Sequence, residues 1–214
     1  MAERARITVI AGVNGAGKSS VVGERLRQSG GEYFNPDEVT RKFQAASTSL
    51  TLAEANSRAW DEGKQRLEEA IRVRADFVFE TTLGVTTMTE LLSEALDEGL
   101  EVALFYVGLD KVELHLARVR ARVAAGGHDI PEPKIRERYA SSLKNLVKLA
   151  PRLTELRVFD NSLDADPKTG QAPAPRELLK SEGGRVTAHC ELSTCPEWAK
   201  PILGLLLRGT EPAE

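Results

Sequence analysis

Residues 12–19 are Gly12-Val13-Asn14-Gly15-Ala16-Gly17-Lys18-Ser19, and they match the pattern G-x-x-x-x-G-K-[ST]. Residues 6–11 before them form an apolar run typical of a buried strand, and residues 18–28 are predicted to form a helix. In this context, backbone N–H groups of the loop and the positive end of the helix dipole face phosphate groups. The sequence therefore predicts that the chain binds a nucleoside triphosphate.

The loop residues have distinct expected roles. Lys18 is expected to reach the β- and γ-phosphates, and the Ser19 hydroxyl to ligate Mg²⁺. A plain glycine turn with a surface lysine does not account for the full pattern with both flanks. The residues expected to bind ATP in this segment are Gly12, Asn14, Gly15, Ala16, Gly17, Lys18, Ser19 and Ser20.

Composition narrows the class of protein. The 214 residues suggest one domain, and the net charge of −3 argues against a general nucleic-acid binder. No apolar run approaches the roughly 20 residues that span a membrane. Residues 1–6 lead into the first strand without an apolar signal region, so a cytoplasmic location is expected. Cys190 and Cys195 lack the second ligand pair of a zinc site and are interpreted as ordinary residues.

Helix and strand patterns alternate, which favours an α/β fold with a mainly parallel sheet and helices on both faces. Strands are predicted at 6–11, 32–35, 76–80, 101–107 and 156–160. After the first helix, further helices are predicted from Asp37 as N-cap, from a Thr51–Glu54 capping box to about Arg74, and at 87–98, 111–125 and 134–149.

Three segments follow from this pattern. Residues 1–163 are expected to form the core, including a helical lid at about 111–149. Residues 164–176 are expected to form an exposed loop. Residues 177–214 are expected to be a C-terminal appendage packed on the core, with a strand at 185–188 and a helix at 201–208.

Polar residues follow each predicted strand of the sheet. In open parallel sheets, ligands bind beyond the carboxyl ends of the strands, so these residues are expected to meet at one edge. They are the segments Asn35-Pro36-Asp37, Glu80-Thr81-Thr82, Leu109-Asp110 and Asp160-Asn161-Ser162.

Phosphoryl transfer to a hydroxyl needs a base near the acceptor, and Asp37 is the candidate. Its alternative role as a helix cap is compatible with this one. Glu80 is expected to bind acceptor hydroxyls or a Mg²⁺-bound water, or else to be a carboxylate satisfied by its neighbours. Thr82 is expected either to donate a hydrogen bond to the acceptor or to begin the next helix.

Cations are expected from two helices joined at Gly126-Gly127. Arg118 and Arg122 are four residues apart and share a helix face, as do Lys134 and Arg138. Together they are predicted to form a lid that closes over the triphosphate and excludes water.

Each lid residue also has a simpler interpretation. The arginines can be solvated or paired with Glu132 and Glu137. His128, in the hinge, is either a contact to phosphate or substrate or a hydrogen-bonded hinge residue.

Four segments in this order resemble the zeta-toxin-like P-loop kinases: residues 12–20, 33–37, 80–83 and 126–139. The resemblance covers about residues 5–162. It implies a doubly wound kinase fold with a helical lid and ATP-dependent phosphorylation of UDP-N-acetylglucosamine on the 3′-hydroxyl of its amino sugar. The chain departs from the family in being shorter than typical plasmid zeta toxins, and sugar contacts beyond residues 80–83 are not matched.

The resemblance also implies roles for individual residues. Lys18 and Ser19 would serve ATP and Mg²⁺, and Asp37 would be the base. Glu80 and Thr82 fall in the acceptor-binding segment. The possible lid arginines are Arg118, Arg122 and Arg138, and Asn161 falls in the loop near the adenine.

Two alternatives remain open at this stage. One is a kinase of another small hydroxyl compound, such as a nucleoside, a dinucleotide or an antibiotic. The other is an ATP-binding switch without an acceptor. An antitoxin partner is possible for this family, but no residue of the chain identifies one.

Overall fold

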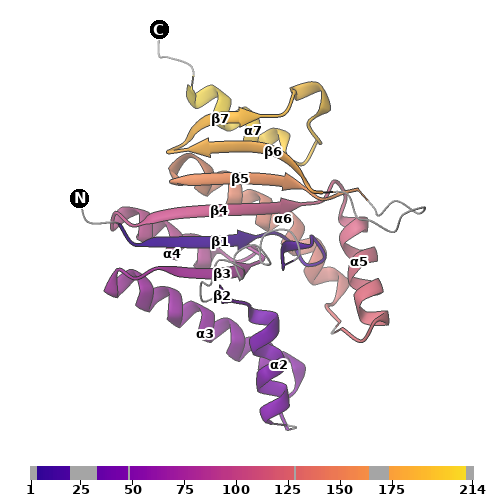
Figure 1. The fold of residues 1–214 in the computed structure, drawn as a ribbon. Coiled ribbons are helices and arrows are strands. Elements are labelled where there is room, and N and C mark those ends of the chain that lie inside the picture. The colour runs from indigo at the N-terminus through magenta and orange to yellow at the C-terminus, as the bar shows by residue number, and fades with distance from the viewer. Residues whose placement is uncertain (1–3, 20–32, 48, 128, 164–173, 211–214) are drawn as a thin grey trace.

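The computed structural model describes residues 4–19, 33–47, 49–127, 129–163 and 174–210 (Figure 1). Its centre is a seven-stranded sheet with the strand order β2-β3-β1-β4-β5-β6-β7. The first five of these are parallel neighbours, whereas β6 and β7 are antiparallel. The strands are β1 Arg6–Ala11, β2 Tyr33–Phe34, β3 Phe77–Thr81, β4 Glu101–Gly108, β5 Glu155–Asp160, β6 Arg176–Glu182 and β7 Arg185–His189. The expected α/β fold with a mainly parallel sheet is confirmed.

The central strand β1 is apolar along nearly its whole length because it is covered on both faces. Ile7, Val9 and Ile10 are fully buried between the neighbouring strands β3 and β4. A strand buried on both faces has a continuous rather than an alternating apolar pattern. This is why residues 6–11 were recognisable from the sequence.

The helices occupy nearly the predicted positions. They are α2 Pro36–Ala46, α3 Leu52–Val73, α4 Thr86–Asp97, α5 Val112–Ala124, α6 Glu132–Leu149 and α7 Lys200–Thr210. Most of the helix predicted at 18–28 lies outside the described residues, and so does most of the loop predicted at 164–176. Helices α3, α4, α6 and α7 contact one another in this order, and α5 extends beyond the carboxyl ends of the strands (Figure 1).

The start of α2 differs from the prediction. The N-cap is Asn35, whose side-chain oxygen accepts hydrogen bonds from the backbone N–H groups of Asp37 and Glu38. Pro36 follows at the first helical position, where its missing N–H costs nothing. Asp37 therefore lies inside the first turn, and the prediction that it caps the helix was wrong. The Thr51–Glu54 capping box of α3 is confirmed.

Strand β6 was not predicted. It begins at Arg176, the last residue of the predicted exposed loop, and continues through Glu177-Leu178-Leu179-Lys180-Ser181-Glu182, which do not alternate cleanly between apolar and polar. The strand forms by pairing with β5, and Arg157 Nε lies 2.6 Å from Glu177 Oε1 across the two strands. Cross-strand pairing of this kind depends on the partner strand, which a local pattern does not reveal.

The C-terminal residues contribute to the main core. Trp198, Ile202 and Leu206 are buried in the same cluster as β1 and β4. Gly108 at the end of β4 makes this possible, because a Cβ there would lie 2.5 Å from the Trp198 ring.

Both cysteines are free, and burial raises the pKa of the Cys195 thiol to about 11. Within the described residues, no helix is both long and apolar enough to cross a membrane.

Candidate active site

The loop after β1 needs glycine at two points of close approach. Gly12 has φ +145°, and a Cβ there would lie 2.2 Å from the Val107 carbonyl oxygen of β4. Gly15 has φ +83°, and a Cβ there would lie 2.8 Å from the His115 carbonyl oxygen of α5. Larger residues are therefore excluded by both backbone conformation and space. The loop packs closely against β4 on one side and against α5 on the other.

Glu80, the penultimate residue of β3, connects the loop to the neighbouring strands. Lys18 Nζ lies 3.4 Å from Glu80 Oε1, and both side chains are buried. Ser19 Oγ donates to Glu80 Oε2 at 2.9 Å and Asn35 Nδ2 donates to the same oxygen at 3.2 Å, as does the Tyr33 hydroxyl. This ion pair is thus well satisfied, as buried charges must be. Sequence reasoning missed Tyr33 and the Asn35 side chain as partners of Glu80.

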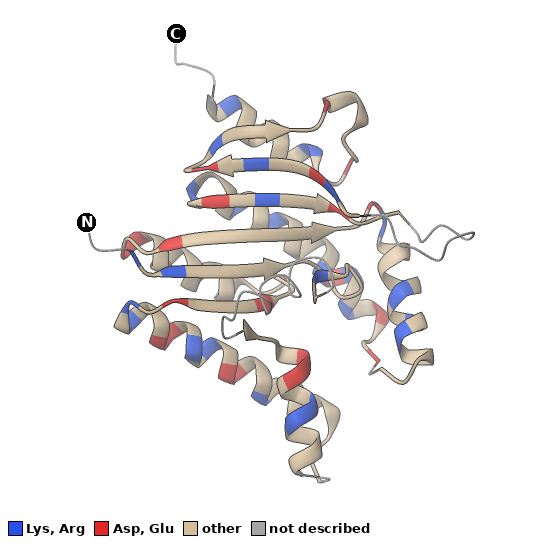
Figure 2. Cartoon of the chain, in the orientation of Figure 1, with Lys and Arg blue, Asp and Glu red and all other residues tan. Residues whose placement is uncertain are grey.

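Asp37 faces α5. Its Oδ2 lies 3.6 Å from Arg122 Nη1, and both side chains are partly exposed. Figure 2 shows the acidic segment at the start of α2 and the basic segments of α5, the two helices that this pair joins. The structure thus brings together two predicted site residues that are 85 positions apart in the chain (122 minus 37).

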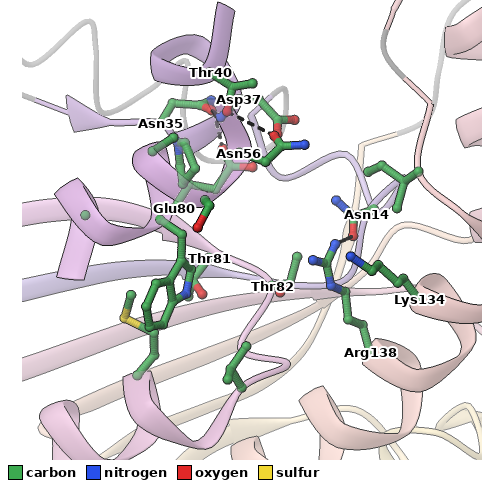
Figure 3. Close-up of a pocket in the computed structure, with 18 of the residues that line it drawn as sticks. Asn14, Asn35, Asp37, Thr40, Asn56, Glu80, Thr81, Thr82, Lys134 and Arg138 are labelled. Atoms are coloured by element: carbon green, nitrogen blue, oxygen red, sulfur yellow. Dashed lines mark hydrogen bonds between the residues drawn. The ribbon is translucent and has the colours of Figure 1, made fainter. Parts of the chain in front are cut away.

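Arg138 contacts the phosphate loop directly. Its Nη1 donates to Asn14 Oδ1 at 2.8 Å (Figure 3). Burial lowers the pKa of the Arg138 guanidinium, and the nearby carboxylates of Asp37 and Glu137 oppose this shift. Lys134, one turn earlier on α6, lines the same cavity as Arg138. The predicted shared face of Lys134 and Arg138 therefore points to the site.

Arg118 lies elsewhere. Its Nη2 donates to the Leu163 carbonyl oxygen at 3.2 Å, near the segment that follows β5. In that segment, Asn161 Nδ2 donates to the Ala16 carbonyl oxygen at 2.8 Å, so Asn161 does reach the phosphate loop. Arg120, which is not one of the predicted lid arginines, pairs with Glu132. Ser20 and His128 lie outside the described residues.

A cavity of about 670 Å³ opens beside Lys18. One part of its wall is polar and includes Asp37, Thr40, Asn56, Glu80, Thr82 and Arg138. Another part is apolar and includes Phe34, Trp60 and Met88. Figure 3 shows the polar side chains converging from α2, α3, β3 and α6. The volume is in the range of pockets that hold small organic ligands.

The contribution of α3 was missed by the sequence reasoning. Thr40 is buried, and its hydroxyl donates to Asn56 Oδ1 at 3.0 Å, which links α2 to α3. Asn56 and Trp60 are four residues apart and share the helix face that lines the cavity. That spacing was visible in the sequence, but nothing local showed that this face is turned toward the phosphate loop.

His115 of α5 hydrogen-bonds to the backbone of the phosphate loop. Its Nδ1 lies 2.9 Å from the Asn14 carbonyl oxygen, so this nitrogen carries the proton that it donates. Burial lowers the pKa of the His115 imidazole to about 4; the hydrogen bond to Asn14 opposes this shift, and Lys18 and Arg118 add to it. The ring is therefore neutral near pH 7. No sequence motif indicated this residue.

We expect His115 to make the protein less stable in acid. The pKa of His115 is about 4 in the folded protein and 6.5 in the unfolded chain, so the unfolded chain binds the proton more readily. The free energy of unfolding therefore falls as pH drops from about 6.5 to 4. The expected loss is on the order of 3 kcal/mol at pH 4. Urea unfolding at several pH values measures it.

The variant His115→Asn retains an N–H donor but does not titrate. Its free energy of unfolding should fall less steeply than that of the natural protein between pH 6.5 and 4. His189→Asn, at an exposed position on β7, is the matched control. Equal slopes for the natural protein and His115→Asn would contradict the expectation.

The glycine loop after β1, the sheet order and the adjoining cavity define a P-loop kinase-like α/β protein. Residues 7–144 match the model of the family AAA_33, described as an AAA domain. The chain belongs to this family. An uncharacterized protein of Haemophilus influenzae is 31% identical over 133 residues, which cover 60% of this chain and 88% of that protein.

Two solved structures share the fold. One is the AvrRxo1-ORF1:AvrRxo1-ORF2 complex with ATP, with a TM-score of 0.65 and 16% identity over 99% of this chain and 66% of that chain. The other belongs to the PezAT chromosomal toxin-antitoxin system of Streptococcus pneumoniae, with a TM-score of 0.52 and 13% identity over 75% of this chain and 68% of that chain. This chain thus spans just under two thirds of the length of the AvrRxo1 relative.

Proposed function

We propose that this protein is a kinase that transfers the γ-phosphate of ATP to a hydroxyl group of a small molecule. The observation that carries this proposal is that one cavity is lined by Lys18 of the phosphate loop, by Asp37 and by Arg138. A nucleotide switch has no need for a carboxylate and a roomy, partly apolar cavity beside its phosphate loop. A kinase needs both, because it must hold an acceptor and take its proton.

Each residue has a chemical task in the proposed reaction. Lys18 and Arg138 stabilise the negative charge that spreads over the transferred phosphoryl group. Asp37 accepts the proton of the attacking hydroxyl. Its side chain is partly exposed and its partner Arg122 is 3.6 Å away, so an acceptor hydroxyl can approach it.

Mg²⁺ is the cofactor that this chemistry implies, and the donor set fits it. The exposed Ser19 hydroxyl lies 2.9 Å from Glu80 Oε2, and Mg²⁺ prefers such oxygen ligands together with waters and phosphates. When bound, the ion would neutralise charge on the β- and γ-phosphates. Ser19 would hold it, with Glu80 close enough to orient its water ligands.

We also propose that α5 and the first turns of α6 act as the lid. Both reach across the site, since Arg122 contacts Asp37 of α2 and Arg138 contacts Asn14 of the phosphate loop. The later part of α6 is anchored in the core, where Ser142 and Leu146 are buried. Any lid motion would therefore be confined to residues before about 142.

The acceptor that we propose to test first is UDP-N-acetylglucosamine. The segments 33–37, 80–83 and 126–139 resemble those of zeta-toxin-like kinases. The cavity supports an acceptor of this kind, because Trp60 and Phe34 offer apolar surface to a ring, while Asn56 and Asp37 offer hydrogen bonds. Another hydroxyl metabolite would use the same phosphate machinery.

The experiment incubates the protein with ATP, Mg²⁺ and UDP-N-acetylglucosamine and measures the product mass. A product heavier by one phosphoryl group, formed only with active protein, supports both the kinase activity and this acceptor. ATP binding without this product refutes the acceptor, and a small-metabolite extract is then screened for a phosphorylated compound. No acceptor-dependent turnover with any extract refutes the kinase proposal and favours an ATP-binding switch.

A further inference from the structure

The loop that follows β3 has a strained residue at its centre. Leu83 has φ +53°, a conformation that a bulky side chain rarely adopts, and it is fully buried. Strain of this kind persists only where surrounding contacts hold it, and it concentrates at functional sites. Under the proposed kinase function, residues 81–84 form the acceptor loop, because Thr81 and Thr82 line the cavity.

Two hydrogen bonds accepted by Thr81 hold only the beginning of the acceptor loop. The Thr81 carbonyl oxygen accepts a hydrogen bond from Gly12 N at 3.2 Å, which ties the loop to the phosphate loop. The Thr81 hydroxyl accepts one from Leu83 N at 3.0 Å, which closes the turn. Neither contact holds the Leu83 carbonyl group.

Asn145 of α6 supplies the contact on the other side. Its Nδ2 donates to the Leu83 carbonyl oxygen at 2.8 Å, and the side chain is buried. A carbonyl oxygen only accepts, so the amide N–H₂ group must face it. A buried carbonyl without a donor is costly, and this bond thus stabilises the strained turn.

The same face of α6 also contacts Gly84, the next residue of the acceptor loop, and the phosphate loop. Arg138 and Asn145 are seven residues apart, so they lie on one side of the helix. A Cβ at Gly84 would lie 2.9 Å from Arg138 Cγ, and the Arg138 guanidinium donates to Asn14. This face of α6 therefore touches both loops that must be aligned for transfer.

We infer that Asn145 is a positioning residue, which holds the acceptor loop in register with the phosphate loop through the Leu83 carbonyl. It does not touch the cavity and takes no part in the chemistry; it acts by keeping Thr82 at the cavity wall. This inference rests on the proposed kinase function for its effect on acceptor use, but the structural part stands without it.

The test compares two variants of Asn145 with a matched control. Asn145→Leu nearly keeps the size of the side chain and removes the donor, and Asn145→Ala removes both. Ser142→Ala is the control, because Ser142 is also buried on α6 but hydrogen-bonds to the Tyr106 hydroxyl, away from the acceptor loop. Each of the three variants thus removes a buried hydrogen bond of the same helix.

The first readout is amide hydrogen exchange of a peptide that contains residues 81–85, which requires no substrate. Exchange should quicken by about tenfold in both Asn145 variants, as expected for the loss of a buried hydrogen bond, and should be unchanged in Ser142→Ala. Equal exchange in the Asn145 variants and the control overturns the inference. If one Asn145 variant does not fold, the other gives the comparison.

The second readout is the split between kinetic constants with the acceptor found above. KM for the acceptor should rise by about tenfold in the Asn145 variants, and KM for ATP should stay within about twofold of the natural protein. A general loss of structure would change both constants together, and that result would overturn the positioning role. Should the natural protein phosphorylate no acceptor, the kinase proposal fails while the exchange readout still decides the role of Asn145.

Discussion

Replacing Asp37 with Asn is expected to lower the rate of phosphoryl transfer by a factor of about 10²–10⁴, the usual contribution of a general base. The amide cannot accept the acceptor's proton but has nearly the same size as the carboxylate. The helix start should survive, because Asn35 and not Asp37 caps α2. ATP affinity should also survive, because the hydrogen bonds and ion pairs of Lys18 and Ser19 do not involve Asp37. Single-turnover transfer and equilibrium ATP binding measure the two effects separately.

Glu38→Gln is the matched control for Asp37→Asn. Glu38 is the next residue of the same helical turn, and it does not line the cavity. The substitution removes the same charge near the same helix N-terminus, so it reproduces any effect on the helix dipole. Transfer by Asp37→Asn at nearly the natural rate, or an equal loss in Glu38→Gln, would show that Asp37 is not the base.

Replacing Lys18 with Ala is expected to reduce transfer by a factor of at least about 10³, because the charge nearest the transferred group is lost. Unlike Asp37→Asn, this change should also weaken ATP binding. Lys18 Nζ is 3.4 Å from Glu80 Oε1 in a buried pair, so the variant leaves that carboxylate without its cation. Removal of one partner of a buried pair commonly destabilises a protein by about 3–5 kcal/mol.

The loss of stability should fall at the lower end of that range. Glu80 keeps three donors, from Ser19, Tyr33 and Asn35. Lys64→Ala is the control, since Lys64 pairs with Glu68 one turn along α3, both side chains are partly exposed, and such pairs contribute little. Thermal unfolding, ATP binding and transfer are measured on both variants. A Lys18→Ala protein that is folded and transfers phosphate at the natural rate would refute the assigned role of the loop.

Much of the fold was predictable because its signals are local. The five parallel strands are apolar runs that end in polar segments, and the Thr51–Glu54 capping box closes within four residues. Boundaries shifted by a residue or two, as for β3 at Phe77–Thr81. Strand β6 was not predicted, because its apolar and polar residues alternate poorly and it forms by pairing with β5. The N-cap of α2 was misplaced by two residues, since Asn35, Pro36 and Asp37 all favour a helix start.

The candidate site was predictable in part for the same reason. The phosphate loop was recognised from its glycine-rich motif. Asp37 and Glu80 were predicted to lie near it because polar residues after parallel strands meet at one edge of the sheet. The orientation of each lid arginine was not predictable. Arg122 and Arg138 turn toward Asp37 and Asn14, while Arg118 turns toward Leu163. Helical spacing shows which residues share a face, but not what that face contacts.

By itself, the sequence determined the phosphate loop, the order of the helices and strands apart from β6, and the edge of the sheet at which the polar residues gather. These features depend on backbone conformations and hydrogen bonds among residues close together in the chain, or on the rule that parallel strands end at one edge. Only the tertiary structure decided that Lys18, Ser19, Tyr33 and Asn35 all converge on Glu80, and that Asn145 holds the carbonyl group of Leu83. Such contacts join residues up to 62 positions apart, and they follow from strand order and helix packing, which no local pattern encodes.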